Sequence, residues 1–162
     1  MIKTAILTMS DKGARGERED GTGEAIKNIL PIENYIVNYY KIIPDDIDKI
    51  VEELTYLCDE VKVNLIITNG GTGFSKRDVT PEATMRVIEK QVPGITEAMR
   101  SESLKITPKA MLSRAISGIR KETLIINLPG SPKGAVENLQ VILPALVHGI
   151  EILIGDVSEC AR

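Results

Sequence analysis

The chain has 162 residues, a net charge of −3 and 43% hydrophobic residues, which is typical of one globular domain spanning residues 1–162. A slight acidic excess argues against nucleic-acid binding through a bulk positive field. We find no run approaching the roughly 20 apolar residues that cross a bilayer, so no membrane contact is expected. The polar start does not resemble a signal peptide, and Cys58 and Cys160 lack the spacing of a metal site. A cytoplasmic protein with reduced thiols is expected.

Predicted strands and helices alternate along most of the chain. Strands are expected over residues 3–9, 35–43, 63–68, 115–120 and 123–128. Helices are expected over residues 24–30, from Pro44 to 57, from Thr80 onward, over 94–104 and 108–112, and over 133–143 with a bent continuation to 154. Residues 10–23 are polar and contain glycine, so we expect a solvated loop there. This order predicts an α/β fold, a three-layer sandwich whose mostly parallel sheet carries helices on both faces.

The loop after the third predicted strand carries three glycines, Gly70, Gly71 and Gly73. Ligands of open α/β sheets bind outside the carboxyl ends of the strands. Glycine allows positive φ and close approach, and successive N–H groups together with a helix start form an anion site. A phosphate cradle and a tight turn without a ligand both fit this pattern. A P-loop is excluded because GxxxxGK[ST] is absent, and the third glycine of GxGxxG is also missing.

Two carboxylates, Asp45 and Asp78, are expected near the same edge. Like charges about 4 Å apart repel by about 4 kcal/mol at an effective dielectric constant of about 20. A carboxylate beside a phosphate must therefore either point away from it or share a cation with it. Mg²⁺ fits the second case, because this ion is typically held by carboxylates together with substrate phosphates. The alternatives are a helix-dipole contact for Asp45, and capping or a salt bridge with Arg77 for Asp78.

The basic residues and the only histidine limit the types of reaction that the sequence supports. His148 lies in the late apolar helix, and we interpret it as structural or peripheral. No Ser-His-Asp or Cys-His arrangement can be built around it, so metal-assisted phosphoryl or nucleotidyl transfer fits better than histidine catalysis. Lys76, Arg77 and Lys133 are candidates for binding anionic groups, although Lys76 fits a solvated surface more simply.

Six motifs, in order, resemble the MogA/MoaB-type molybdenum cofactor biosynthesis proteins, the molybdopterin adenylyltransferases, whose module also forms the G domain of gephyrin and of its plant counterpart. They are SDKG at 10–13, IIPDD at 42–46, TNGGTGFSKRDVTPEAT at 68–84, PGITEAMR at 93–100, AMLSRAISGIR at 110–120 and NLPGSPKGAVENL at 127–139. GGTG alone is a weak signal, but this set covers nearly the whole chain in order. One position departs from the family: Asn69 stands where Thr or Gly is common.

The resemblance implies the molybdenum cofactor biosynthesis protein fold and the transfer of AMP from ATP to the phosphate of molybdopterin, with Mg²⁺ as cofactor and pyrophosphate as leaving group. The functional aspartates of the family fall on Asp45 and Asp78, which are also the candidates for holding Mg²⁺. The phosphate- and pterin-binding positions, and four motif positions near them, fall on Gly70, Gly71, Thr72, Gly73, Pro129, Gly130, Ser131, Pro132, Lys133, Ser10, Asp11, Ser113 and Arg114.

The resemblance also implies an assembly and a partner. Family members are commonly homotrimers, with hexamers as the alternative. The sequence ends at residue 162 without the longer tail of some relatives, which leaves this choice open, and a trimer is the preferred expectation. The product passes to a molybdate-insertion protein. Two other classes of function stay open: a non-catalytic molybdopterin carrier or scaffold, and a metal-dependent nucleotide hydrolase. The choice between molybdate and tungstate stays open as well.

Overall fold

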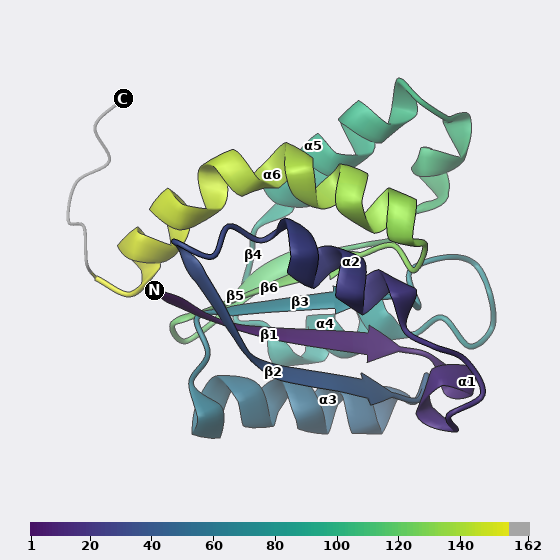
Figure 1. The fold of residues 1–162 in the computed structure, drawn as a ribbon, viewed down its shortest axis with the longest axis horizontal. Helices are drawn as coiled ribbons and strands as arrows, with labels where there is room; N and C mark the ends of the chain where they lie inside the picture. The colour runs from purple at the N-terminus through teal and green to yellow at the C-terminus, as the bar shows by residue number, and fades with distance from the viewer. Residues whose placement is uncertain (156–162) are drawn as a thin grey trace.

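A six-stranded sheet forms the middle layer of the computed structural model, which describes residues 1–155 (Figure 1). The strands are β1 (Ile2–Met9), β2 (Tyr35–Ile43), β3 (Leu65–Asn69), β4 (Lys90–Gln91), β5 (Ser117–Arg120) and β6 (Thr123–Leu128). In the order β2-β1-β3-β6-β5-β4, the first four strands are parallel, whereas β5 and β4 are antiparallel to their neighbours. The pairing of β1 with β2 starts with Ile2 opposite Tyr35 and shifts register between Thr4 and Ala5. The predicted mostly parallel sheet is confirmed.

Helices cover both faces of the sheet, as the sequence predicts. They are α1 (Asp11–Ala14), α2 (Gly21–Ile29), α3 (Ile47–Tyr56), α4 (Thr80–Val87), α5 (Pro93–Leu104) and α6 (Pro132–Leu153). A π-helical turn at Leu57–Val61 extends α3, and a 3₁₀ helix at Pro108–Leu112 follows α5. Helices α2, α5 and α6 pack on one face, and α3 and α4 pack on the other (Figure 1).

Aliphatic side chains of the central strands alternate between the two resulting cores. On β1, Ile6 packs on the α2 and α6 side, whereas Leu7 packs on the α3 side. On β3, Ile67 packs on the α2 and α6 side and Ile66 packs on the α3 side. All four of these side chains are fully buried. A strand covered on both faces favours apolar residues on both, which explains the run Leu65-Ile66-Ile67 in the first part of β3.

The parallel arrangement brings four strand ends to one edge of the sheet. Strands β1, β2, β3 and β6 end at Met9, Ile43, Asn69 and Leu128, all on the side of the sheet where α1 lies in Figure 1. The loops that follow these ends carry the residues singled out in the sequence. Strand β5 runs antiparallel to β6, and the short β4 runs antiparallel to β5, so the site-bearing edge is built from the four adjacent parallel strands.

Residues 10–23 contain more regular structure than the solvated loop expected there, so that expectation is wrong. Ser10 caps α1 by accepting from Gly13 N (2.9 Å), and Asp20 caps α2 by accepting from Gly23 N (2.9 Å). Helix α2 begins at Gly21 rather than at residue 24. Glycine is a poor helix former, so the composition hid this first turn, although an aspartate at the N-cap is a recognised start signal.

Other differences concern boundaries and one short strand. Helix α3 begins at Ile47 with Asp46 as its N-cap, so Asp45 lies before the helix and not in its first turn. Strand β5 begins at Ser117, two residues after the expected start. Strand β4 was not predicted, because its two residues are exposed and show no apolar alternation. The predicted continuation of α6 past Pro144 is confirmed.

Helix α6 corrects the expectation that no segment could span a bilayer. By length and apolar composition alone, its 22 residues could cross a membrane. In the fold, however, Ala135, Leu139, Ile142 and Leu146 of α6 are buried in the core beside α2 and α5. A core helix of a domain passes the same test of length and composition, so this feature is weak support for a membrane segment.

The thiols and the histidine lie away from the strand ends. Cys58 is buried, and burial raises the pKa of its thiol to about 11. Cys160 lies outside the described residues. His148 is exposed on α6, more than three helical turns beyond the start of this helix at the strand ends. Neither Cys58 nor His148 therefore belongs to the edge where the glycine loops gather.

Candidate functional site

The loop after β3 turns sharply at two adjacent glycines. Gly70 has φ +91° and Gly71 has φ +69°, a region that other L-residues rarely adopt. A Cβ at Gly70 would lie 2.5 Å from Met9 O, and a Cβ at Gly71 would lie closer than 3.0 Å to Thr80 Oγ1. Thr80 fixes the turn, because its Oγ1 donates to Gly70 O (2.9 Å) and its N donates to Gly71 O (3.1 Å). Both positions require glycine for conformation and for space.

The loop after β6 packs directly against this turn. A Cβ at Gly130 would lie 3.2 Å from Gly70 Cα, so the two backbones nearly touch. Thr22 of α2 donates from Oγ1 to Gly130 O (2.7 Å). Ser131 caps α6 by accepting from Gly134 N (3.2 Å). The start of α6, which is the positive end of the helix dipole, therefore lies beside the glycine turn and favours an anion there.

Asp78 closes the glycine loop. Its Oδ2 accepts from Gly73 N and from Ser75 N, both at 3.1 Å. Within residues 1–155, no hydrogen-bond donor reaches its Oδ1. The salt bridge with Arg77 that the sequence left open is not formed, because Arg77 pairs with Asp11. Asp78 therefore has one carboxylate oxygen that holds the loop and a second that is available to a ligand.

Asp45 and Asp11 form a reciprocal pair between the ends of β1 and β2. Asp45 Oδ2 accepts from Asp11 N (3.1 Å), and Asp11 Oδ1 accepts from Asp45 N (3.0 Å). Burial raises the pKa of the Asp45 carboxyl above its usual value, and the negative charges of Asp11 and Asp78 raise this pKa further. The hydrogen bond from the Asp11 backbone lowers this pKa, but the net shift is upward. The Arg77 guanidinium lowers the pKa of the Asp11 carboxyl. The two carboxyls thus lie in opposite electrostatic environments.

Asp45 and Asp78 together fit a divalent cation. A Cβ at Gly71 would lie 3.2 Å from Asp45 Oδ1, so this oxygen faces the glycine turn, and no donor in the described part of the chain reaches it. Residues 1–155 contain no cluster of three or more His, Cys, Asp or Glu that could hold a metal by itself. Two carboxylates fit Mg²⁺, because this ion keeps several waters and is usually bound by one or two carboxylates plus substrate phosphates.

Arg114 shapes the glycine loop. Its Nε donates to Gly73 O (2.7 Å), its Nη2 donates to Asp78 O (2.8 Å), and its Nη1 pairs with the Glu82 carboxylate. Its backbone N donates to Thr72 O (2.9 Å). Each guanidinium nitrogen is thus bonded to the protein, which indicates a structural contribution from a residue that the family motif placed near the substrate.

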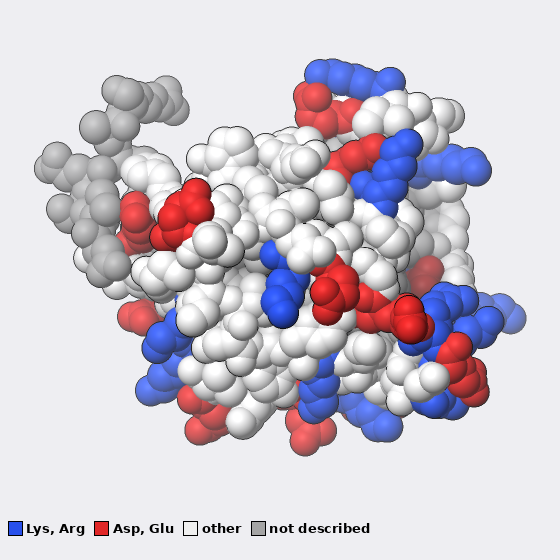
Figure 2. Space-filling view, in the orientation of Figure 1, with Lys and Arg blue, Asp and Glu red and all other residues white. Residues whose placement is uncertain are grey.

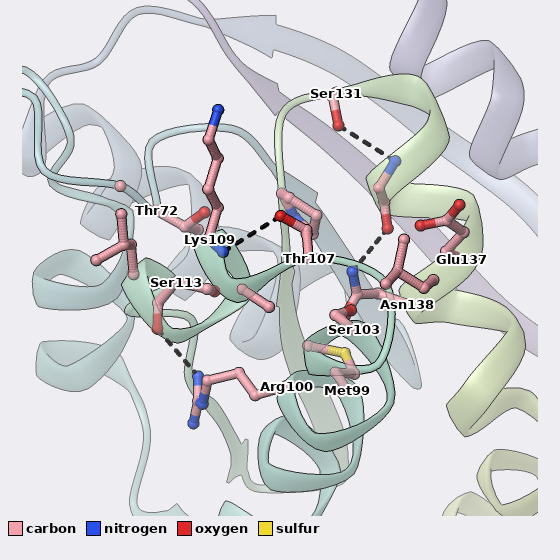
Figure 3. Close-up of a pocket in the computed structure, with 16 residues that line it drawn as sticks. Thr72, Met99, Arg100, Ser103, Thr107, Lys109, Ser113, Ser131, Glu137 and Asn138 are labelled. Carbon is pink, nitrogen blue, oxygen red and sulfur yellow. Dashed lines mark hydrogen bonds between the residues drawn. The ribbon is translucent and has the colours of Figure 1, made fainter.

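A cavity of about 320 Å³ opens on one side of the glycine loop (Figure 3). Five predicted residues line it: Thr72, Gly73, Ser113, Pro129 and Ser131. Figure 3 shows Thr72 and Ser113 on one wall and Asn138 on the opposite wall, with Lys109 between them. Sequence reasoning missed Lys109, Asn138 and Arg100. Arg100 lies in the quoted PGITEAMR motif and Asn138 in the quoted NLPGSPKGAVENL motif, whereas Lys109 lies outside all six motifs.

A second cavity, of about 270 Å³, adjoins the same loop at Asn69 and Gly70 and is more polar. The predicted residues Ser10, Gly70 and Gly130 line it, together with residues that sequence reasoning missed, among them Asp20 and Thr22. The Asp20 carboxylate accepts hydrogen bonds from the hydroxyls of Thr8 and Tyr40.

Asn69, the departure from the family pattern, also lines the second cavity. Its Nδ2 donates to Thr8 Oγ1 (2.9 Å) and to Leu7 O (3.3 Å). Its Oδ1 is buried and has no partner among the described residues. The amide therefore joins the ends of β1 and β3 and leaves one acceptor unsatisfied beside the glycine turn.

The remaining predicted residues lie at the rim. Pro132 occupies the first turn of α6, and Lys133 is exposed, with its Nζ 3.9 Å from Glu137 Oε1. Lys76 is exposed, as expected. Figure 2 shows charged side chains of both signs gathered around the α1 edge, whereas the surface over α6 is largely uncharged. The site edge therefore has mixed charge and is not a basic patch.

Comparison with known proteins gives a consistent result. A family model described as a probable molybdopterin binding domain matches residues 5–148. A molybdopterin adenylyltransferase from Helicobacter pylori is 43% identical over 162 residues, covering 98% of this chain and 91% of the relative. Gephyrin from Dictyostelium discoideum is 43% identical over 158 residues, covering 91% of this chain and 22% of gephyrin.

Solved structures agree with this assignment. The molybdopterin biosynthesis enzyme MoaB from Thermus thermophilus superposes with a TM-score of 0.91 at 47% identity, covering 96% of this chain and 98% of that one. The tungsten cofactor synthesizing protein MoaB from Pyrococcus furiosus superposes with a TM-score of 0.79 at 29% identity, covering 94% of this chain and 97% of that one. The α/β fold, the glycine loops and these matches lead to one conclusion: this chain belongs to the molybdopterin-binding family of molybdenum cofactor biosynthesis proteins.

Proposed function

We propose that this protein is a molybdopterin adenylyltransferase, which transfers AMP from ATP to the phosphate of molybdopterin and releases pyrophosphate. Relatives of that name are 43% and 37% identical over 98% and 92% of this chain. One structural observation carries the proposal: Asp45 and Asp78, from two different loops, both lie against the glycine loop, Asp45 with Oδ1 facing Gly71 and Asp78 with Oδ2 bonded to Gly73 N. An anion site with two carboxylates beside it is the arrangement that metal-assisted nucleotidyl transfer needs.

The chain's own groups suggest how two substrates would be held. The backbone N–H groups of the glycine turn and the start of α6 would bind phosphates. Asp45 and Asp78 would hold Mg²⁺, which would neutralise phosphate charge when bound. The cavity of about 320 Å³ is lined by Thr72 and Gly73 and the cavity of about 270 Å³ by Gly70 and Gly130, so both adjoin the glycine loops. One substrate in each cavity would therefore place both phosphate groups at the turn, and this proximity lowers the entropic part of the barrier.

Further parts of the proposal rest on the family resemblance. We propose a single-domain, cytoplasmic protein that uses Mg²⁺, forms a homotrimer with a hexamer as the alternative, and passes its product to a molybdate-insertion protein. The site residues expected from the sequence are proposed to bind substrate, with Arg114 and Asp11 acting through the loops that they hold. Because one solved relative is described as tungsten cofactor synthesizing, a tungstate pathway is the alternative to molybdate.

The proposal is tested by measuring AMP transfer from α-labelled ATP to molybdopterin with Mg²⁺ present. Asp78→Asn should lower the rate about 100-fold or more, the scale of losing an electrostatic contact to the transition state. Asp46→Asn is the matched control, because Asp46 caps α3 by accepting from Lys49 N (3.0 Å) and an asparagine keeps that cap. Its rate should stay close to that of the unmodified protein.

Two outcomes would favour the other classes of function. Molybdopterin binding without labelled product would indicate a carrier or scaffold. Breakdown of ATP in the absence of molybdopterin would indicate a nucleotide hydrolase. Equal rates in Asp78→Asn and the unmodified protein would contradict the role assigned to this carboxylate.

A further inference from the structure

The Asp11 carboxylate is bonded entirely to protein groups. Arg77 donates from Nε to Asp11 Oδ2 (2.9 Å) and from Nη2 to Asp11 Oδ1 (2.9 Å), so the pair is bidentate. Asp11 Oδ1 also accepts from Asp45 N (3.0 Å). Both oxygens therefore have donors, and the negative charge is already compensated by a guanidinium. Such a carboxylate is poorly suited to bind a substrate or a cation directly.

These contacts join three segments that are far apart in the sequence. Asp11 follows β1, Asp45 follows β2, and Arg77 lies in the loop between β3 and α4. Arg77 and Asp11 are 66 residues apart in the chain. A displacement of any of the three segments would break at least one of these hydrogen bonds. The position of Asp45 relative to the glycine loop is therefore set through Asp11.

The orientation of Asp45 follows from the same contacts. Its Oδ2 accepts from Asp11 N (3.1 Å), which holds one carboxylate oxygen in place. The other oxygen, Oδ1, is the one that faces Gly71. Rotation of the carboxylate would exchange or misplace these two oxygens and would lose the hydrogen bond from Asp11. One interaction thus decides which oxygen is presented to the turn.

We propose that Asp11 and Arg77 are positioning residues that hold the Asp45 carboxylate in the orientation needed to bind a divalent cation at the glycine turn. The inference rests on the proposed function, in which Asp45 contacts that cation. It differs from the sequence-based expectation, which placed Asp11 near substrate and treated Arg77 as a candidate for binding anions. Residues that orient a metal ligand commonly change metal affinity or activity by about 10- to 100-fold when they are replaced.

The chain offers a matched control for replacing Arg77. Arg15 forms the same kind of bidentate pair with Glu17, with Nε and Nη2 each 3.0 Å from a carboxylate oxygen. Both arginine side chains are about equally exposed, at 58% for Arg15 and 62% for Arg77. Exposed ion pairs of this kind contribute little to stability. The variants Arg77→Gln and Arg15→Gln should therefore unfold at temperatures close to that of the unmodified protein.

The affinity for a divalent cation should differ between Arg77→Gln and Arg15→Gln. Mg²⁺ and Mn²⁺ are titrated calorimetrically into the full chain saturated with a non-hydrolysable ATP analogue, and the Mg²⁺ concentration for half-maximal AMP transfer is measured in parallel. Arg77→Gln should raise the dissociation constant for the cation and the half-maximal concentration by about 10- to 100-fold. Arg15→Gln should change neither quantity by more than about twofold. Arg77→Lys, which keeps the charge without the bidentate geometry, should fall between them.

Two results would overturn the proposal. One is equal cation affinity in Arg77→Gln and Arg15→Gln. The other is weaker binding of the ATP analogue by Arg77→Gln at saturating Mg²⁺ with unchanged cation affinity, which would mean that Arg77 contacts the nucleotide. The proposed function is tested by a different measurement. Absence of AMP transfer by the unmodified protein would refute the transferase activity, whereas a loss of cation affinity in Arg77→Gln would still support the role of Arg77 in positioning Asp45.

Discussion

Replacing Gly71 by alanine would test the glycine turn on which the site is built. At φ +69°, a residue with a Cβ loses about 1–2 kcal/mol in the left-handed region. The new Cβ would also lie closer than 3.0 Å to Thr80 Oγ1, so the hydroxyl must move. Its buried hydrogen bond to Gly70 O (2.9 Å) would be lost, at about 1–3 kcal/mol. The expected loss of unfolding free energy is therefore about 2–5 kcal/mol.

A second glycine separates the two contributions to this loss. Gly16 has φ +73°, and a Cβ there would meet no atom within 4 Å, so Gly16→Ala should lose only about 1–2 kcal/mol. Urea unfolding of both variants and the unmodified protein measures the difference, and thermal unfolding should show about 2–4 °C for each kcal/mol in a chain of this size. Equal losses in Gly71→Ala and Gly16→Ala would refute the reasoning that Thr80 and Gly71 are in obligatory close contact.

Two further predictions concern an acidic residue and an arginine. Hydrogen bonds from Arg120 and Lys121 lower the pKa of Asp59 from its usual 3.8 to about 2. The stability that this ionised carboxylate contributes is therefore present above pH 3.8 and is lost as the pH falls toward 2. Melting temperatures should show Asp59→Asn below the unmodified protein at pH 7, with a gap that narrows below pH 3.8; a constant gap would argue against this ion pair. Arg114→Lys should lower the unfolding free energy by about 1–3 kcal/mol, because it loses charged hydrogen bonds to Gly73 O and Asp78 O. Unchanged stability in a urea titration, together with weaker molybdopterin binding, would instead make Arg114 a substrate contact.

The fold could be predicted where burial leaves a pattern in the sequence. The apolar run of β3 predicts a strand because both faces of that strand pack against helices, and the β-branched and aromatic residues of β2 predict a strand through their β-propensity. The boundaries of β2 at Tyr35 and Ile43 are correct. Strand β4 could not be predicted, because its pairing with β5 involves exposed residues and depends on tertiary structure. The first turn of α2 was hidden because two glycines, Gly21 and Gly23, outweighed the cap at Asp20.

The site could be predicted in part for a similar reason. The glycine turn and the closeness of Asp45 and Asp78 to it follow from local sequence and from the shared edge of parallel strands. The partner of Arg77 could not be predicted, because the nearest carboxylate in sequence, Asp78, faces its own loop, whereas Asp11 comes from another strand end. The second cavity was missed because Asp20 lies in a segment that was interpreted as solvated loop.

The direction of the strands also decides where this domain can be attached to something else. The start of β1, the turn between β5 and β6 and the end of α6 lie together at the edge opposite the glycine turn (Figure 1). A fusion partner or a surface tether joined at that edge would leave the mouths of both cavities unobstructed. The Dictyostelium gephyrin, in which the matching segment is 22% of the chain, shows that such a module can be part of a much longer polypeptide.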